Sequence, residues 1–74
     1  MKQSILSEKL VHARTILRLA QSEVAHHVGC SQTTYHNWES AKHIPSMKHI
    51  TKLCQILELK LDDVLPPHNH LIIS

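Results

Sequence analysis

A single glycine near the middle of this 74-residue chain constrains its fold more than any other residue. Gly29 separates two short segments, 21–28 and 31–40, whose apolar residues recur at helical spacing. Two helices that meet at a steep angle across so short a turn need a residue that tolerates a positive φ at the corner. They also need a small residue where they approach most closely, and Ala25 lies four residues before the glycine. The stretch therefore predicts two helices joined by a tight turn.

The composition favours an all-helical domain. The chain has no Phe, one Trp and one Tyr, so its core must be mostly aliphatic, with Trp38 as the largest piece. One Gly and three Pro leave few residues for hairpin turns, and no segment alternates polar and apolar residues over a useful length. Residues 1–67 are predicted to form one small domain, and residues 68–74 a C-terminal tail.

Five helices are predicted from apolar stripes and capping residues. The stripes of the first and fourth helices are Leu6, Leu10, Ala13 and Leu17, and Met47, Ile50, Leu53, Cys54 and Leu57. Ser31 and Ser46 are the expected caps of the third and fourth helices, whereas Ala20 stands where the second helix lacks one, at a cost of about 1 kcal/mol. The expected bounds are Ser4 or Ser7 to Leu17 or Arg18, then 21–28, 31–40, 46–57 and 61–65.

Four segments of the chain, spread over residues 6–65, together resemble the Cro/phage-repressor (XRE-type) helix-turn-helix family. They are AQSEVAHHVG, CSQTTYHNWE, IPSMKHITKLCQIL and LDDVL. The resemblance implies a compact five-helix, all-α domain that binds DNA through its second and third helices. Arg18 and Ala41 stand where this family often has glycine, so the turn geometry at these two places is in question.

The resemblance also assigns roles to individual residues. Gln21 matches a position that contacts a DNA phosphate and braces the third helix. Arg14 and Glu39 match a partly buried ion pair between the first and third helices, and Trp38 matches a core position. The predicted DNA-binding set comprises the start of the second helix, the cap and polar face of the third helix, and the loop after it: Gln21, Ser31, Gln32, Thr33, His36, Asn37, Lys42 and His43.

The chemistry of the polar face supports a base-reading role. Gln and Asn amides can present a donor and an acceptor together to adenine. Residues 29–41 contain no Lys or Arg, so the common Arg–guanine contact is absent and A·T pairs are favoured. Positive charge comes instead from Lys42, Lys48 and Lys52, which suit phosphate contacts. A merely solvated polar face is the alternative interpretation of the same residues.

The predicted function is a sequence-specific transcriptional regulator, a repressor that binds double-stranded operator DNA as a homodimer. One copy covers little DNA, and two copies could read half-sites one helical turn apart. The last helix and the apolar residues 71–73 are the predicted dimer surface. The alternative is an antitoxin or protein-interaction module of the same fold that binds a partner toxin, which the apolar tail would also suit.

Other classes of function are not favoured by the sequence. Its eight His and two Cys show no metal-ligand spacing, and the two Cys are expected on core faces as free thiols. No nucleophile–base pattern is present, so neither an enzyme nor a cofactor is predicted. The formal charge of +2 is mildly basic. Without a signal peptide or a membrane-spanning stretch, the chain is expected to be soluble and cytoplasmic.

Overall fold

The computed structural model describes residues 5–64, and within this range every regular element is an α-helix. The helices are α1 (Ile5–Ile16), α2 (Gln21–Val28), α3 (Gln32–Glu39), α4 (Met47–Leu57) and α5 (Leu61–Val64). The predicted all-α fold of five helices is confirmed for this part of the chain. The proposed cap Ser4, the predicted last residue of the fifth helix and the tail 68–74 lie outside the described residues.

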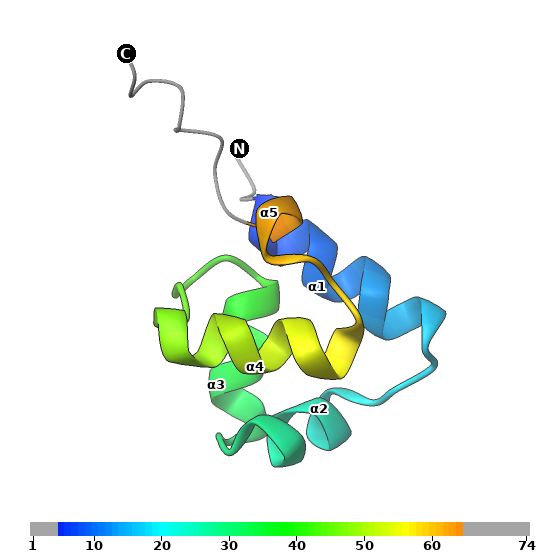
Figure 1. Ribbon diagram of the computed structural model, residues 1–74. Helices are drawn as coiled ribbons and strands as arrows, with labels where there is room; N and C mark the ends of the chain where they lie inside the picture. The colour runs from blue at the N-terminus through cyan, green and yellow to red at the C-terminus, as the bar shows by residue number, and fades with distance from the viewer. Residues whose placement is uncertain (1–4, 65–74) are drawn as a thin grey trace.

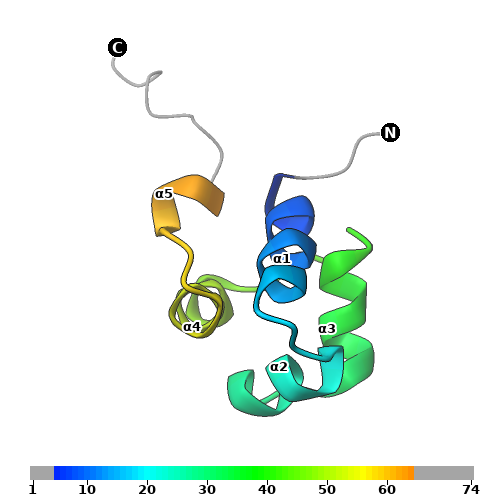
Figure 2. The ribbon, with the colours of Figure 1, turned by 90° about the vertical axis from the view of Figure 1, so that its right-hand side faces the viewer.

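The helices pack as a single cluster in which α2 crosses one end of α3. Figure 2 shows α1 between α3 and the α4–α5 pair, with α2 running beneath them at a steep angle to α3. The main helix contacts centre on α1 and α4: α1 packs on α3, α4 and α5, and α4 packs on α1, α2 and α5. The α5 helix lies at the end of the domain away from α2 (Figure 1).

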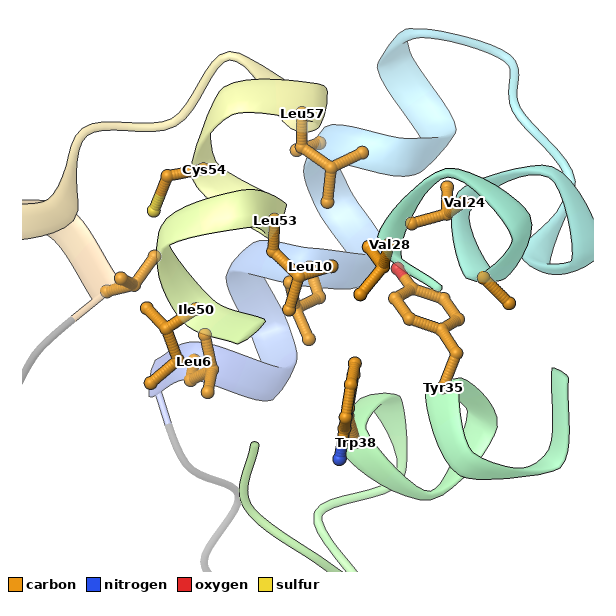
Figure 3. Close-up of a cluster of buried hydrophobic side chains, with 13 residues drawn as sticks. Leu6, Leu10, Val24, Val28, Tyr35, Trp38, Ile50, Leu53, Cys54 and Leu57 are labelled. Atoms are coloured by element: carbon orange, nitrogen blue, oxygen red, sulfur yellow. The ribbon is translucent and has the colours of Figure 1, made fainter. Parts of the chain in front are cut away.

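The core lies where α1, α2, α3 and α4 converge (Figure 3). Tyr35 and Trp38 project from α3 into this space, and their rings meet edge to face with centroids 6.1 Å apart. Trp38 is 4% exposed, so the prediction that it is a core residue is confirmed. The surrounding side chains are almost all aliphatic, as the composition predicts: Leu6, Leu10, Ala13, Val24, Ala25, Val28, Ile50, Leu53, Leu57 and Val64, with Cys54 among them.

The corner between α2 and α3 has the geometry that its sequence predicts. Gly29 adopts φ 94° in the left-handed region, and its N–H donates to the Ala25 carbonyl at 2.9 Å. The Cys30 N–H donates to the same carbonyl at 3.0 Å. Apart from Gly29 itself and the residues adjacent to it in the chain, no atom lies within 4 Å of the place that a Cβ would take on Gly29. The backbone angle, and not crowding, therefore favours glycine at this corner.

The start of α4 differs from the prediction. The apolar stripe predicts that Met47 is buried, but it is 50% exposed. Near the start of α4 the buried residue is instead Pro45, which precedes the helix. His49 is half-buried, and its ring centroid is 5.2 Å from that of Trp38. The Ser46 side chain also makes no capping hydrogen bond, because its hydroxyl lies 3.1 Å from His49 Nδ1.

The segment between α1 and α2 also differs slightly from the prediction. The α1 helix ends at Ile16, slightly before the predicted Leu17 or Arg18, and Leu17 N–H still donates to Ala13 O at 3.1 Å. Ala20 has no capping side chain, as expected, but its own N–H donates to Glu23 Oε1 at 2.7 Å. This contact is one half of a capping box, so one of the two bonds of that motif is retained.

Among residues 5–64, three residues other than glycine have left-handed backbone angles: Arg18 (φ 59°), Ala41 (φ 64°) and Glu58 (φ 58°). The first two are the positions at which the family resemblance put the turn geometry in question. Glu58 follows α4, and its backbone N–H donates to the Cys54 carbonyl. Because a Cβ disfavours this conformation, each of the three turns costs stability that glycine would spare.

We expect Ala41→Gly to stabilise the domain by about 0.5–1 kcal/mol, since relief of the left-handed strain exceeds the extra freedom of the unfolded chain. The midpoint of urea unfolding measures the effect. Lys42→Gly is the control, because the neighbouring Lys42 has no positive φ and glycine there only adds unfolded-state freedom. A rise in midpoint for Ala41→Gly with a fall for Lys42→Gly is the expected result, and a fall for both contradicts the strain.

Candidate nucleic-acid interface

A bidentate ion pair joins α1 to the end of α3. Arg14 Nε donates to Glu39 Oε2 at 2.6 Å, and Arg14 Nη2 donates to Glu39 Oε1 at 3.1 Å. The Glu39 side chain is only 6% exposed and that of Arg14 20%. Arg14 Nη1 also donates to the Leu19 carbonyl at 2.9 Å, so the same guanidinium holds the loop that leads into α2. Arg14 and Glu39 are the two residues that the resemblance pairs.

Gln21, the first residue of α2, extends this network to the surface. Its Nε2 donates to Glu39 Oε1 at 2.9 Å and lies 3.3 Å from His36 Nδ1. The carboxylate of Glu39 is therefore shared between a guanidinium from α1 and an amide from α2. As a result, α3 is held at one carboxylate by both helices that precede it.

The electrostatics of the buried carboxylate favour its charged form. Burial opposes ionisation of Glu39, but the hydrogen bonds from Arg14 and Gln21 and the charge of Arg14 outweigh it, so its pKa is lowered. The hydrogen bond with Glu39 raises the pKa of Arg14. Burial and the nearby carboxylate raise the pKa of Tyr35, whose hydroxyl makes no hydrogen bond of standard geometry within the described chain. The phenol therefore stays neutral beside the ion pair.

Part of the predicted DNA-binding set gathers at one place. Gln32, Thr33 and His36 are exposed on the outer face of α3, and together with Gln21 they line one shallow hollow. The hollow lies where the start of α2 meets the first two turns of α3. It presents two amides, a hydroxyl and an imidazole, and no charged side chain lines it.

The other predicted contact residues are placed differently. The Ser31 hydroxyl accepts from Thr34 N–H at 3.1 Å and donates to Thr34 Oγ1 at 2.9 Å, so it caps α3 as predicted. Asn37 is half-buried, and its backbone carbonyl accepts from Lys42 N–H at 2.9 Å and from His43 N–H at 3.3 Å. Lys42 and His43 are exposed in the loop after α3.

Two lysines of α4 lie beside the corner between α2 and α3. Lys48 and Lys52 line a second hollow together with Gly29, Val28 and His49. His49, which belongs to none of the predicted sites, packs its ring against that of Trp38. Its position one residue before the buried Ile50, at the border of the apolar stripe, was the signal for this contact.

No metal site or membrane-spanning helix is found among residues 5–64. No group of three or more His, Cys, Asp or Glu in this range could hold a metal ion. None of its helices is long and apolar enough to cross a membrane. Cys54 is buried and Cys30 half-buried, both as free thiols.

The segment that contains the α2–α3 corner matches a known protein family. Residues 10–64, which contain the corner and the Arg14–Glu39 pair, match the family described as helix-turn-helix. The chain belongs to the helix-turn-helix family. The family membership predicted from the sequence is thereby confirmed.

Two individual proteins illustrate the similarity of this helix-turn-helix domain to known molecules. It is 29% identical over 59 residues to the cryptic phage CTXphi transcriptional repressor RstR of Vibrio cholerae serotype O1. The aligned region covers 80% of this chain and 53% of RstR. The chain thus spans about half the length of that relative. Its fold matches the P22 c2 repressor in complex with synthetic operator 9T, with a TM-score of 0.79. That match covers 86% of this chain and 96% of the repressor at 23% identity, and it shows the shared fold.

We expect Glu39→Gln to flatten the acid dependence of stability. A carboxylate whose pKa is lowered by folding contributes stability that is present above its unfolded pKa, about 4.3, and is lost as the pH falls through its folded value. The free energy of unfolding of the wild type should therefore fall between about pH 5 and pH 3 more steeply than that of Glu39→Gln. At pH 7 the variant should be less stable by roughly 1–3 kcal/mol.

Glu8→Gln is the matched control for this measurement, because Glu8 is exposed on α1 and makes no ion pair within the described residues. Its unfolding free energy should follow the wild-type pH dependence. Equal slopes for the wild type and Glu39→Gln would show that the network contributes no pH-dependent stability.

Proposed function

We propose that this chain is a sequence-specific DNA-binding transcriptional regulator, a repressor that binds double-stranded operator DNA through α3. The observation that carries the proposal is the exposed face formed by Gln32, Thr33 and His36, held in place by the Gln21–Glu39 hydrogen bond. The fold match to a repressor in complex with a synthetic operator, and the sequence similarity to the repressor RstR, support it.

The groups on this face suit contacts with base edges in the major groove. An exposed helix of this kind can enter the groove, with its first residues nearest the bases. The Gln32 amide can donate and accept together with adenine, and the Thr33 methyl suits thymine. Neither Lys nor Arg occurs on α3, so the proposed half-site is rich in A·T pairs.

Phosphate contacts are assigned to residues around this face. Lys42 and His43 follow α3 in an exposed loop, and Lys48 and Lys52 lie beside the α2–α3 corner. These side chains can position the domain on the backbone without reading sequence. Gln21 is half-buried at the start of α2, and its NH₂ group faces both Glu39 Oε1 and His36 Nδ1, so bracing α3 is assigned to this side chain in preference to the predicted phosphate contact. Ser31 and Asn37 contribute chiefly by fixing the start of α3 and the loop after it.

The proposed assembly on DNA is a homodimer. Specific interfaces with DNA generally bury more surface than one small domain offers, and two copies would read half-sites about 34 Å apart. The dimer contact is placed at α5 and the residues after it, because α5 lies at the opposite end of the domain from α2 (Figure 1). In this arrangement α2 and α3 of both copies remain free to face the DNA.

A selection of bound fragments from random DNA, run at two salt concentrations, tests the function directly. A common sequence among the fragments is the expected result, and the salt dependence of affinity counts the phosphates neutralised. Binding that is equally strong to all fragments at both salt concentrations contradicts sequence-specific regulation.

Gln32→Ala is expected to weaken binding to the selected site by about tenfold, because a good amide–base contact contributes roughly 1–3 kcal/mol of discrimination. Binding to unrelated DNA should remain unchanged. Gln55→Ala is the matched control, since Gln55 is also exposed on a helix but lies on α4 away from the proposed contacts. Fluorescence anisotropy with labelled duplexes measures both affinities. Equal affinities of the two variants for the selected site would refute the role of the α3 face.

Truncation after residue 67 is expected to weaken dimer formation, because the proposed contact includes residues 71–73. Sedimentation equilibrium of the full chain and of the truncated chain measures the dimer dissociation constant. A truncated chain that dimerises as tightly as the full one contradicts the location of the contact.

If the chain instead co-purifies with a second polypeptide in a stable complex, the antitoxin alternative gains support.

A further inference from the structure

The hydrogen-bond network of the ion pair ends at a residue of the DNA-facing surface. Glu39 Oε1 accepts from Arg14 and from Gln21 Nε2, and the same Nε2 lies 3.3 Å from His36 Nδ1. His36 is exposed and lines the hollow with Gln32 and Thr33. A buried charge on one side of Gln21 is therefore linked to an imidazole on the other.

The chemistry of the groups fixes the direction of each hydrogen bond. An ionised carboxylate can only accept, so the atom of Gln21 next to Glu39 must be its NH₂ group. Glu39 is held ionised by Arg14, whose guanidinium donates to both of its oxygens. The second hydrogen of that NH₂ group then points to His36 Nδ1, which must accept it. A neutral imidazole that accepts at Nδ1 carries its proton at Nε2.

We propose that Gln21 is a positioning residue that fixes the tautomer of His36, so that His36 offers DNA a donor and no acceptor. The inference rests on the proposed function for its consequence at DNA, but the tautomer itself is a property of the free protein. An unbraced imidazole could present either nitrogen, as a donor or as an acceptor. With Nδ1 engaged by Gln21, only the protonated Nε2 remains for a base edge.

Because His36 then presents only a hydrogen-bond donor, the bases that it can contact favourably can be predicted. In the major groove, guanine offers N7 and O6, adenine offers N7 and thymine offers O4 as acceptors. Cytosine offers its N4 amino group, a donor, which would oppose the Nε2–H of His36. At the base that His36 contacts, cytosine should therefore be selected against.

Nitrogen NMR of the histidine rings tests the tautomer in the wild-type protein without DNA. At a pH where the ring is neutral, two-bond ¹H–¹⁵N correlations should show His36 protonated at Nε2 alone. His12, exposed on α1, is the internal reference for an unbraced ring with a mixture of both forms. Protonation of His36 at Nδ1, or a mixture like that of His12, overturns the inference.

Two substitutions of Gln21 separate the donor from the rest of the side chain. Gln21→Met removes the donor and should shift His36 to a mixture of tautomers. Gln21→Lys keeps donors only, so it should retain protonation at Nε2. If His36 has the same tautomer in the wild type and in Gln21→Met, Gln21 does not set it. The helical circular dichroism of each variant checks that the domain is folded.

The selection from random DNA tests the consequence at one base pair. Gln21→Met and His36→Ala should both relax the exclusion of cytosine at the same position by about tenfold, while preferences elsewhere stay unchanged. An unaltered sequence preference of Gln21→Met overturns the inference at DNA. If the wild type selects no sequence at all, the proposed function fails, whereas the NMR result on the tautomer still stands by itself.

Discussion

The charge of Glu39 is the interaction on which the rest of this structure depends. An ionised carboxylate that is 6% exposed would be unstable unless it were paired, because burial strongly penalises an isolated charge. The chain satisfies it with a bidentate guanidinium from α1 and an amide from α2. These contacts link three helices at the end of α3. The orientation of α3 relative to α1 and α2 is therefore fixed by polar contacts as well as by the packing of Tyr35 and Trp38 on its inner face.

How much of this could be read from the sequence differs between local and long-range features. The roles of Gly29 and Ala25 could be predicted, because a tight turn between helices needs a residue that tolerates a positive φ and a small residue at the closest approach. Gly29 has the predicted positive φ. The exposure of Met47 could not be predicted, since its spacing continues the apolar stripe of α4 and only the position of neighbouring helices leaves it exposed. The left-handed backbone angle of Glu58 could not be predicted, because a Glu side chain does not favour that conformation.

The candidate site shows the same limit. Residue types and family resemblance together predicted Gln21 and His36 as separate contacts to DNA. The distance between them depends on the steep crossing of α2 and α3, and residues 15 apart in sequence meet only after that crossing is formed. Sequence could thus name the residues of the surface, but it could not supply the hydrogen bond that joins two of them to the buried ion pair.

The separation between the proposed reading face, which has no Lys or Arg, and its lysine-bearing flanks has a consequence for how the domain would discriminate among DNA sequences. A lysine can bind any phosphate, so added salt would weaken the proposed contacts of Lys42, Lys48 and Lys52 with all sequences together. The amides and the hydroxyl of the α3 hollow carry no charge, so their contribution to binding would depend on hydrogen-bond geometry. Geometry on the scale of a single hydrogen bond requires a helix that does not shift. The contacts from Arg14 and Gln21 to Glu39 hold α3 from behind, and they would preserve that geometry on the proposed reading face.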